Sequence, residues 1–113
     1  MKSKDILKLD SLTFDVTQED IDRAEKGNSK ACPIAHAVNR TLGLPTHSAY
    51  VCDMIFRVNV PIEKPPGYEP LVRINHVGIW FDLPRESTEF IRDFDSGAKV
   101  QPFTFTASRM KGV

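Results

Sequence analysis

Residues 48–60 read SAYVCDMIFRVNV, and this stretch decides the predicted fold. Apolar side chains occupy every second position and would share one face: Tyr50, Cys52, Met54, Phe56, Val58 and Val60. Alternation with a period of two is typical of a β-strand that buries one side. We therefore predict one long strand over 48–60, packed on the core through its even-numbered residues.

The segments that follow predict an antiparallel partner for this strand. Residues 61–70 contain four prolines and a glycine, and we expect a loop because proline cannot donate to a sheet or continue a helix. Residues 71–83 form the second strand. Its apolar phase shifts along the chain, and a bulge near 76–78 would account for the shift.

The N-terminal part predicts a strand and two helices. Residues 13–16 alternate as a short strand. Thr17 then begins a near capping box that ends at Asp20 and starts the first helix. Apolar residues recur at helical spacing over 31–42, and Gly43 ends this second helix.

The C-terminal part predicts a third helix over 84–95 and a final strand over 99–107. Pro84 suits the start of the helix. Pro102 indicates that the final strand lies at a sheet edge or carries a bulge. An exposed edge at 99–107 would allow two copies of the chain to pair as a homodimer.

Together these elements predict an α+β fold with the order β-α-α-β-β-α-β. It has about four mostly antiparallel strands, with two to three helices on one face. Residues 13–107 form a single domain. We expect residues 1–12 to form an N-terminal arm or an edge strand, and residues 108–113 to form a flexible tail.

The charge balance excludes several classes of function. The 113 residues carry 15 Lys and Arg against 15 Asp and Glu, so the formal net charge is zero. Nucleic-acid-binding domains are usually basic, and we therefore expect no nucleic-acid partner. No apolar run reaches the ~18 residues of a membrane span, and no long apolar stretch follows the charged start. We therefore expect neither a membrane partner nor a secretory signal.

The cysteines leave one catalytic hypothesis open. Cys32 lies at the predicted start of a helix, where the dipole can lower a thiol pKa, and His36 follows one turn later as a candidate base. The simpler interpretation, which we favour, is a buried and inert thiol at a tight helix entry. In a reducing compartment Cys32 and Cys52 should both be free thiols.

Cysteine and histidine side chains could in principle supply zinc ligands. The candidates are Cys32, His36, His47, Cys52 and His76. Only the first two have ligand-like spacing, so we expect no metal and no other cofactor.

Two arginines form a candidate anion site. Arg57 and Arg73 lie on neighbouring predicted strands, on the face away from the core, with His76 nearby. Two guanidinium groups on one sheet face could hold a phosphate or a carboxylate. The simpler interpretation is a sheet face that only meets water.

Two further features could contact a partner protein. Residues 10–25 contain six acids, among them Asp20 and Glu25, and form either a negative docking face or an ordinary solvated helix. Tyr68 lies in the proline-rich loop, where it would anchor an interface if the loop is more than a stiff hairpin connection.

Four segments are distinctive as a set. They are VTQEDID at 16–22, CPIA at 32–35, FIRDFDSG at 90–97, and Val100 followed by Pro102-Phe103. This set resembles a group of small uncharacterised proteins of tailed phages and some bacterial genomes, over most of residues 14–106. The group has no assigned chemistry. The resemblance implies a phage-type protein in the cytoplasm of a host cell, and it implies no catalytic residue.

Three hypotheses for function follow. The first is a non-catalytic phage-type accessory protein that binds a host protein, with inhibition of a host defence system as its most concrete version. The second is a binder that sequesters a small anionic ligand, such as a nucleotide, through Arg57, Arg73 and His76. The third is a thiol or metal enzyme built on Cys32 and His36.

Overall fold

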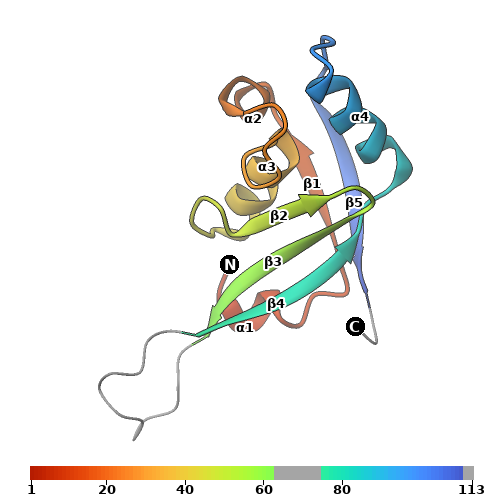
Figure 1. Ribbon diagram of the computed structural model, residues 1–113. Helices are drawn as coiled ribbons and strands as arrows, with labels where there is room; N and C mark the ends of the chain where they lie inside the picture. The colour runs from red at the N-terminus through yellow and green to blue at the C-terminus, as the bar shows by residue number, and fades with distance from the viewer. Residues whose placement is uncertain (63–74, 111–113) are drawn as a thin grey trace, which may run out of the picture.

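The computed structural model describes residues 1–62 and 75–110 (Figure 1). In chain order its elements are α1 (Ser3–Ile6), β1 (Ser11–Val16), α2 (Gln18–Arg23), α3 (Pro33–Leu42), β2 (Ala49–Cys52), β3 (Ile55–Ile62), β4 (Asn75–Asp82), α4 (Arg85–Asp95) and β5 (Phe103–Arg109). Within the described residues, five antiparallel strands and four helices make an α+β fold, which confirms the predicted class.

The strands form one sheet in the order β1-β5-β4-β3-β2. The edge strands are therefore β1 and β2. The prediction that 99–107 forms a sheet edge is only partly correct: β5 lies between β1 and β4 in the sheet order, but it pairs with β4 only at Ser108 and Arg109. The homodimer expected from that edge stays a prediction. Pro102 directly precedes β5, where a missing N–H removes no bond of the ladder.

The stretch 48–60 is two strands rather than one. A turn at Asp53 and Met54 joins β2 to β3, and Asp53 takes a left-handed backbone conformation there, with φ 51°. Cys52 and Ile55 are partners across the turn, and their side chains share the outer face of the sheet. Odd-numbered residues are therefore buried before the turn, and even-numbered residues are buried after it. The buried residues are Ala49 and Val51 before the turn, and Phe56, Val58 and Val60 after it.

The prediction for the even-numbered face is therefore correct only after the turn. Tyr50 is half-buried and Cys52 is exposed, because both point away from the core. Met54, within the turn, is 63% exposed.

The second predicted strand pairs antiparallel with the first, as expected. The register of β3 and β4 runs without interruption from Ile55 opposite Asp82 to Ile62 opposite Asn75. The predicted bulge near 76–78 is wrong, since every residue of this segment has one partner.

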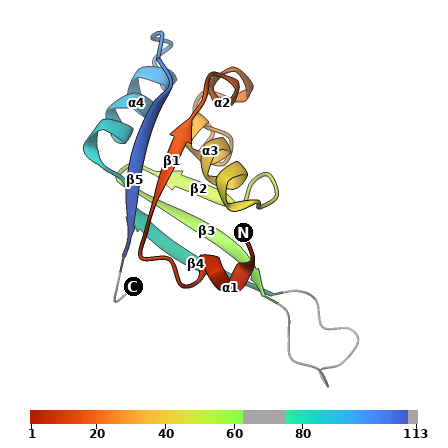
Figure 2. The same cartoon turned by 180° about the vertical axis from the view of Figure 1, so that it is seen from behind.

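The sheet curls so that its two halves face each other across the core. Phe14 of β1 meets Phe56 of β3 edge to face, with ring centroids 5.9 Å apart, although β5 and β4 lie between their strands in the sheet order. Only two register pairs join β4 to β5, which leaves the halves free to diverge. Figures 1 and 2 show β2, β3 and β4 running obliquely across β1 and β5.

Helices cover the concave side of this curl. α3 contacts both edge strands, and its inner residues Ile34, Ala35 and Val38 are fully buried. α4 packs against β5, where Phe90 lies on Phe103 with ring centroids 4.5 Å apart. None of the helices in the described residues is long and apolar enough to cross a bilayer.

The N-terminal segment packs against the domain. Residues 1–12, expected as an arm or an edge strand, contain the short helix α1, whose Ile6 is fully buried. The side chain of Arg109 donates a hydrogen bond to the Leu7 carbonyl. β5 ends at Arg109, so the first two residues of the predicted tail, 108 and 109, belong to the sheet. Residues 111–113 lie outside the described residues.

Replacing Phe56 with alanine is expected to destabilise the fold by about 3–5 kcal/mol, because its ring is fully buried against Phe14 and Phe81. Urea unfolding followed by circular dichroism measures the loss. Met54→Ala is the control, since this exposed side chain should contribute about 0.5 kcal/mol or less. Equal losses in the two variants would contradict the inward phase of β3.

Candidate functional site

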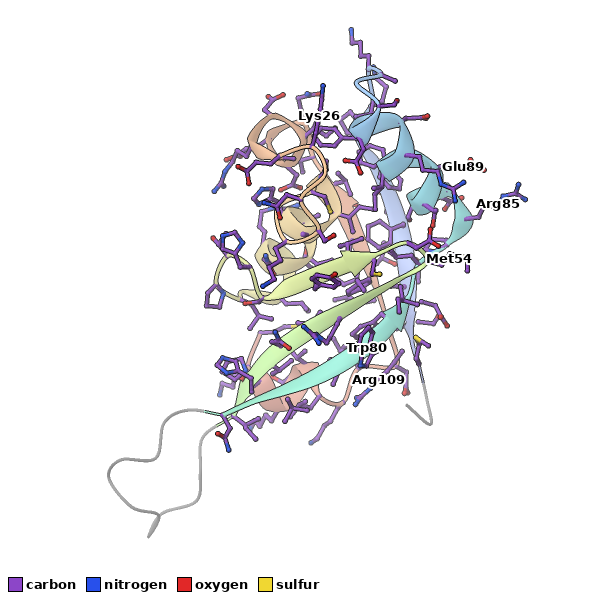
Figure 3. The ribbon with its side chains drawn as sticks, in the orientation of Figure 1. Lys26, Met54, Trp80, Arg85, Glu89 and Arg109 are labelled. Carbon is purple, nitrogen blue, oxygen red and sulfur yellow. The ribbon has the colours of Figure 1, made fainter. Side chains whose placement is uncertain are left out.

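Three side chains form a row across the outer face of β2, β3 and β4. Tyr50, Arg57 and Trp80 oppose one another in the strand register and point away from the core. We call these three residues the outer row. In Figure 1 the three strands lie in front with no helix drawn over them, and Trp80 is labelled on β4 in Figure 3.

The two aromatic rings hold the arginine between them. The guanidinium carbon of Arg57 lies 5.6 Å from the ring centroid of Tyr50 and 5.5 Å from that of Trp80. Both contacts fall within the range of cation–π attraction, which favours guanidinium because its planar group is weakly hydrated. The rings therefore fix the position of a positive charge on the sheet surface.

Gly78 makes room for this arrangement. A Cβ atom at Gly78 would lie 3.2 Å from Cδ of Arg57, closer than an ordinary van der Waals contact. The Arg57 stem therefore passes over a position where a larger residue would displace it.

The charge of Arg57 has no anion beside it among the described residues. No ion pair or hydrogen bond to its side chain occurs there, and its Nε atom is buried without a hydrogen-bond partner. Buried polar atoms are satisfied in most proteins, so this nitrogen is an exception.

An open hollow of about 650 Å³ adjoins the outer row. It is lined by Pro45, Thr46, His47, Ser48, Asn59, Pro61 and His76. His76 lies on the same face of β4 as Trp80, so the structure places two of the predicted ligand-binding residues, Arg57 and His76, on one surface. The other predicted members of these sites, Arg73 and Tyr68, lie outside the described residues.

The predicted acidic face divides into a buried acid and an exposed one. Asp20 is 4% exposed, and it forms a complete capping box with Thr17. Its carboxylate also accepts hydrogen bonds from Arg40 at 3.0 and 3.4 Å. Glu25 is exposed, and its carboxylate accepts from the amide of Asn28. Asp20 is therefore occupied inside the molecule and does not present its charge to a partner.

The environment of Asp20 favours its charged form. Burial alone would raise the pKa of this carboxyl, but hydrogen bonds from Arg40 and Thr17, together with the positive charge of Arg40, outweigh it. The pKa of Asp20 therefore lies below its ordinary value, and the hydrogen bond to Asp20 raises the pKa of Arg40.

Cys32 fits the inert interpretation. It is the N-cap of α3, and its sulfur accepts a hydrogen bond from the backbone N–H of Ala35 at 3.4 Å. Burial raises the pKa of this thiol to about 11, whereas a nucleophile needs a lowered value. Cys32 and His36 line different hollows, and among the described residues no side-chain hydrogen bond joins the thiol to the imidazole; their one hydrogen bond runs from the backbone N–H of His36 to the Cys32 carbonyl.

A metal site is also without support. The described residues contain no group of three or more His, Cys, Asp or Glu side chains that could hold an ion. Both cysteines are free, as expected.

Comparison with known proteins adds no relative. No family model, no curated protein and no solved structure matches this chain. The resemblance to the phage proteins therefore stays a prediction.

Sequence reasoning missed two members of the outer row. One uninterrupted strand over 48–60 places Tyr50 on the core face, and no pattern in the sequence marks Trp80. Asp53 at the centre of the stretch was the available signal, since Asp is favoured in tight turns and tolerates left-handed backbone. A turn there would have placed Tyr50 beside Arg57.

We expect one thiol of the native protein to react quickly with Ellman's reagent near neutral pH, and both to react after denaturation. The reactive group is the exposed Cys52, since Cys32 is buried with a raised pKa. Cys52→Ser should leave the native protein without a fast thiol. Two fast thiols in the native protein would show that Cys32 is accessible.

Asp20→Asn is expected to lower the free energy of unfolding by about 1–3 kcal/mol at neutral pH, because the variant loses the charged hydrogen bonds with Arg40. The native pKa of Asp20 is lowered, so this stability is present above the ordinary carboxyl pKa of about 4 and is lost as the pH falls through the native value. Urea unfolding at neutral pH and at about pH 3 measures this. The difference in free energy of unfolding between the wild type and Asp20→Asn should be smaller at the acidic pH.

The exposed Asp22→Asn, on the same helix, is the control for this measurement, and its effect should stay within about 0.5 kcal/mol at both pH values. A gap between Asp20→Asn and the wild type that does not change with pH would contradict the charged role of Asp20.

Proposed function

We propose that the protein is a non-catalytic accessory protein of phage type that acts by binding a host protein, in its most concrete form as an inhibitor of a host defence system. The observation that supports binding is the outer row, in which Tyr50 and Trp80 hold the Arg57 guanidinium with no ion pair to another described residue. The phage-type origin rests on the sequence resemblance alone.

The composition of the outer row suits a protein interface. Trp, Tyr and Arg are the residue types that dominate measured binding energies in interfaces. Here they come from three paired strands, so the binding geometry is held by the backbone ladder. A preorganised surface loses little conformational freedom on binding, which leaves more of the contact energy for affinity.

The surroundings of the outer row also suit an interface. Ile55 is half-buried and Met54 is exposed at the hairpin end of the same three strands, and both add apolar area. Asn59 and His76 supply polar groups on the other side of the row. An apolar centre with a polar rim is the usual anatomy of an interface. We expect the partner to place an acidic side chain against Arg57.

A second candidate function is sequestration of a small anionic ligand such as a nucleotide. The observation that favours it is the open hollow beside Arg57, whose lining includes Asn59 and His76. A base could stack on an aromatic ring while its phosphate meets the guanidinium. The third hypothesis, a thiol or metal enzyme, is not proposed further, because the Cys32 thiol is buried with a raised pKa.

Affinity capture from bacterial lysate tests the first proposal. Tagged wild type, Arg57→Ala and Trp80→Ala are compared with Arg85→Ala, in which an exposed arginine is removed from α4, away from the outer row (Figure 3). We expect a specific captured protein to bind about tenfold or more weakly to the two outer-row variants, because loss of a central anchor costs 2 kcal/mol or more. The Arg85→Ala control should bind it normally.

Two outcomes would count against protein binding by this surface. One is capture that is equal in all four proteins. The other is a small mass adduct in native mass spectrometry that disappears in Arg57→Ala without any captured protein, which would favour the anionic ligand. Arg57→Lys separates charge from stacking, since lysine keeps the charge but lacks the planar group.

A further inference from the structure

One side of β5 is unpaired along most of the strand. Its register with β4 covers only Ser108 and Arg109, because β4 ends at Asp82. On its other side β5 is paired with β1 from Phe103 to Ser108. Residues 103–107 therefore have a neighbouring strand on one side only, and we call their unpaired side the open edge.

Two threonines direct their backbone groups towards the open edge. The N–H of Arg109 bonds to the Asp10 carbonyl, on the side of β1. Because the direction alternates along an antiparallel ladder, the N–H and C=O groups of Thr104 and Thr106 point away from β1. Among the described residues no backbone hydrogen bond reaches either threonine on that side. Both threonines are exposed, and in Figure 2 β1 and β5 lie in front of the helices.

The two outer edges of the sheet are partly occupied by the chain itself. At β1 the Asp15 carbonyl accepts a hydrogen bond from Arg40 at 2.7 Å. At β2 the N–H of Val51 donates to the Ser29 carbonyl at 2.9 Å. Exposed edges are commonly protected by cover of this kind, by charged side chains or by proline. Residues 103–107 contain neither a charge nor a proline, so the open edge is a template for another strand.

The threonine hydroxyls of β5 form two short rows with β1. The hydroxyl of Thr104 donates to Oδ1 of Asp15 at 2.7 Å, so it can only accept from a further neighbour. Thr13 and Thr106 share a hydrogen bond of 2.8 Å, in which either hydroxyl can be the donor. With Thr13 as the donor, Thr106 keeps its own proton for a further acceptor. The open edge thus offers one hydroxyl acceptor and one hydroxyl donor, two residues apart.

We propose that the open edge of β5 pairs with that of a second copy of the chain, antiparallel about a two-fold axis at Phe105. Thr104 then lies opposite Thr106 of the second copy, and the two such pairs make four backbone hydrogen bonds. On the outer face Thr106 of one copy donates to Thr104 of the other, which continues each row to Asp15. The edge is therefore complementary to itself in its backbone and in its hydroxyls.

Both ends of this pairing are limited by the chain itself. Ser108 is already paired with Asp82. Pro102, the residue before β5, has no N–H that pairing would have to satisfy. The shared ladder is short, so we expect a reversible dimer, and the formal net charge of zero adds no net repulsion between the copies. No residue of the outer row takes part, so the dimer and the proposed protein binding succeed or fail separately.

Sedimentation velocity from about 1 µM to about 1 mM tests the proposal, because this range brackets the dissociation constants of weak dimers. We expect the mass to rise with concentration from 12.7 kDa towards twice that value. Amide hydrogen exchange measured by NMR should show Thr104 and Thr106 protected only at the high concentration. Arg57→Ala should dimerise like the wild type, because it changes the outer row alone.

The key variant is Thr106→Pro, which removes an N–H that has no partner within the chain. We expect it to dimerise about tenfold or more weakly. Thr13→Pro is the matched control, since Thr13 lies opposite Thr106, points its N–H away from β5 and shares the same hydroxyl contact. It should dimerise like the wild type. If either proline variant does not fold, Thr106→Lys and Thr13→Lys make the same comparison, because an edge lysine hinders pairing.

Three results would overturn the proposal. One is a wild type that stays monomeric up to about 1 mM. Another is a folded Thr13 variant that dimerises no better than the matching Thr106 variant, which would place the contact elsewhere. The third is protection of the Thr104 and Thr106 amides that does not depend on concentration, which would mean that the open edge is covered within the monomer.

Discussion

Two adjacent residues of one helix hold the two edges of the curled sheet. Arg40 of α3 donates from Nη2 to the Asp15 carbonyl of β1 at 2.7 Å, and Asn39 accepts from the backbone N–H of Ala49 of β2 at 2.9 Å. The two register pairs between β4 and β5 cannot by themselves fix the angle between the halves of the sheet. α3 therefore sets this angle, and the aromatic contact of Phe14 with Phe56 depends on it.

The same helix explains why the acidic segment belongs to the fold. A buried carboxylate such as Asp20 is tolerated only where hydrogen bonds and an opposite charge compensate the loss of water. Arg40 supplies both, and the capping box with Thr17 supplies the rest. The hydrogen bonds from α3 to the two edge strands also hinder pairing with another chain. Arg40 occupies the Asp15 carbonyl of β1, and Asn39 occupies the Ala49 N–H of β2.

The parts of the fold that follow from local sequence could be predicted. The capping box at Thr17, the helix ending at Gly43 and the antiparallel pairing across the proline-rich loop all depend on residues close together in the chain. The position of β5 between β1 and β4 could not be predicted, because it depends on pairing between residues about ninety positions apart. The helix α1 was missed for a related reason, since Ile6 is buried by distant strands rather than by a local pattern.

The candidate site was only partly predictable, and the reason is again the turn at Asp53. Uninterrupted alternation places Tyr50 with Phe56 in the core, whereas a two-residue turn places Tyr50 opposite Arg57 on the outside. The sequence predicts Arg57 as a possible anion ligand but not its contacts with Tyr50 and Trp80, because the two rings come from two other strands. The two rings matter for binding because they fix the position of the Arg57 guanidinium.

An arginine on a solvated sheet face would move freely and would gain little from an ion pair. Between Tyr50 and Trp80, with its stem over Gly78, its position is already fixed. Stacking stabilises the cation without neutralising it, since an aromatic face attracts a positive charge but carries no net charge. An approaching anion therefore meets a charge that is already ordered and partly desolvated, which is the condition under which a single ion pair contributes substantially to binding.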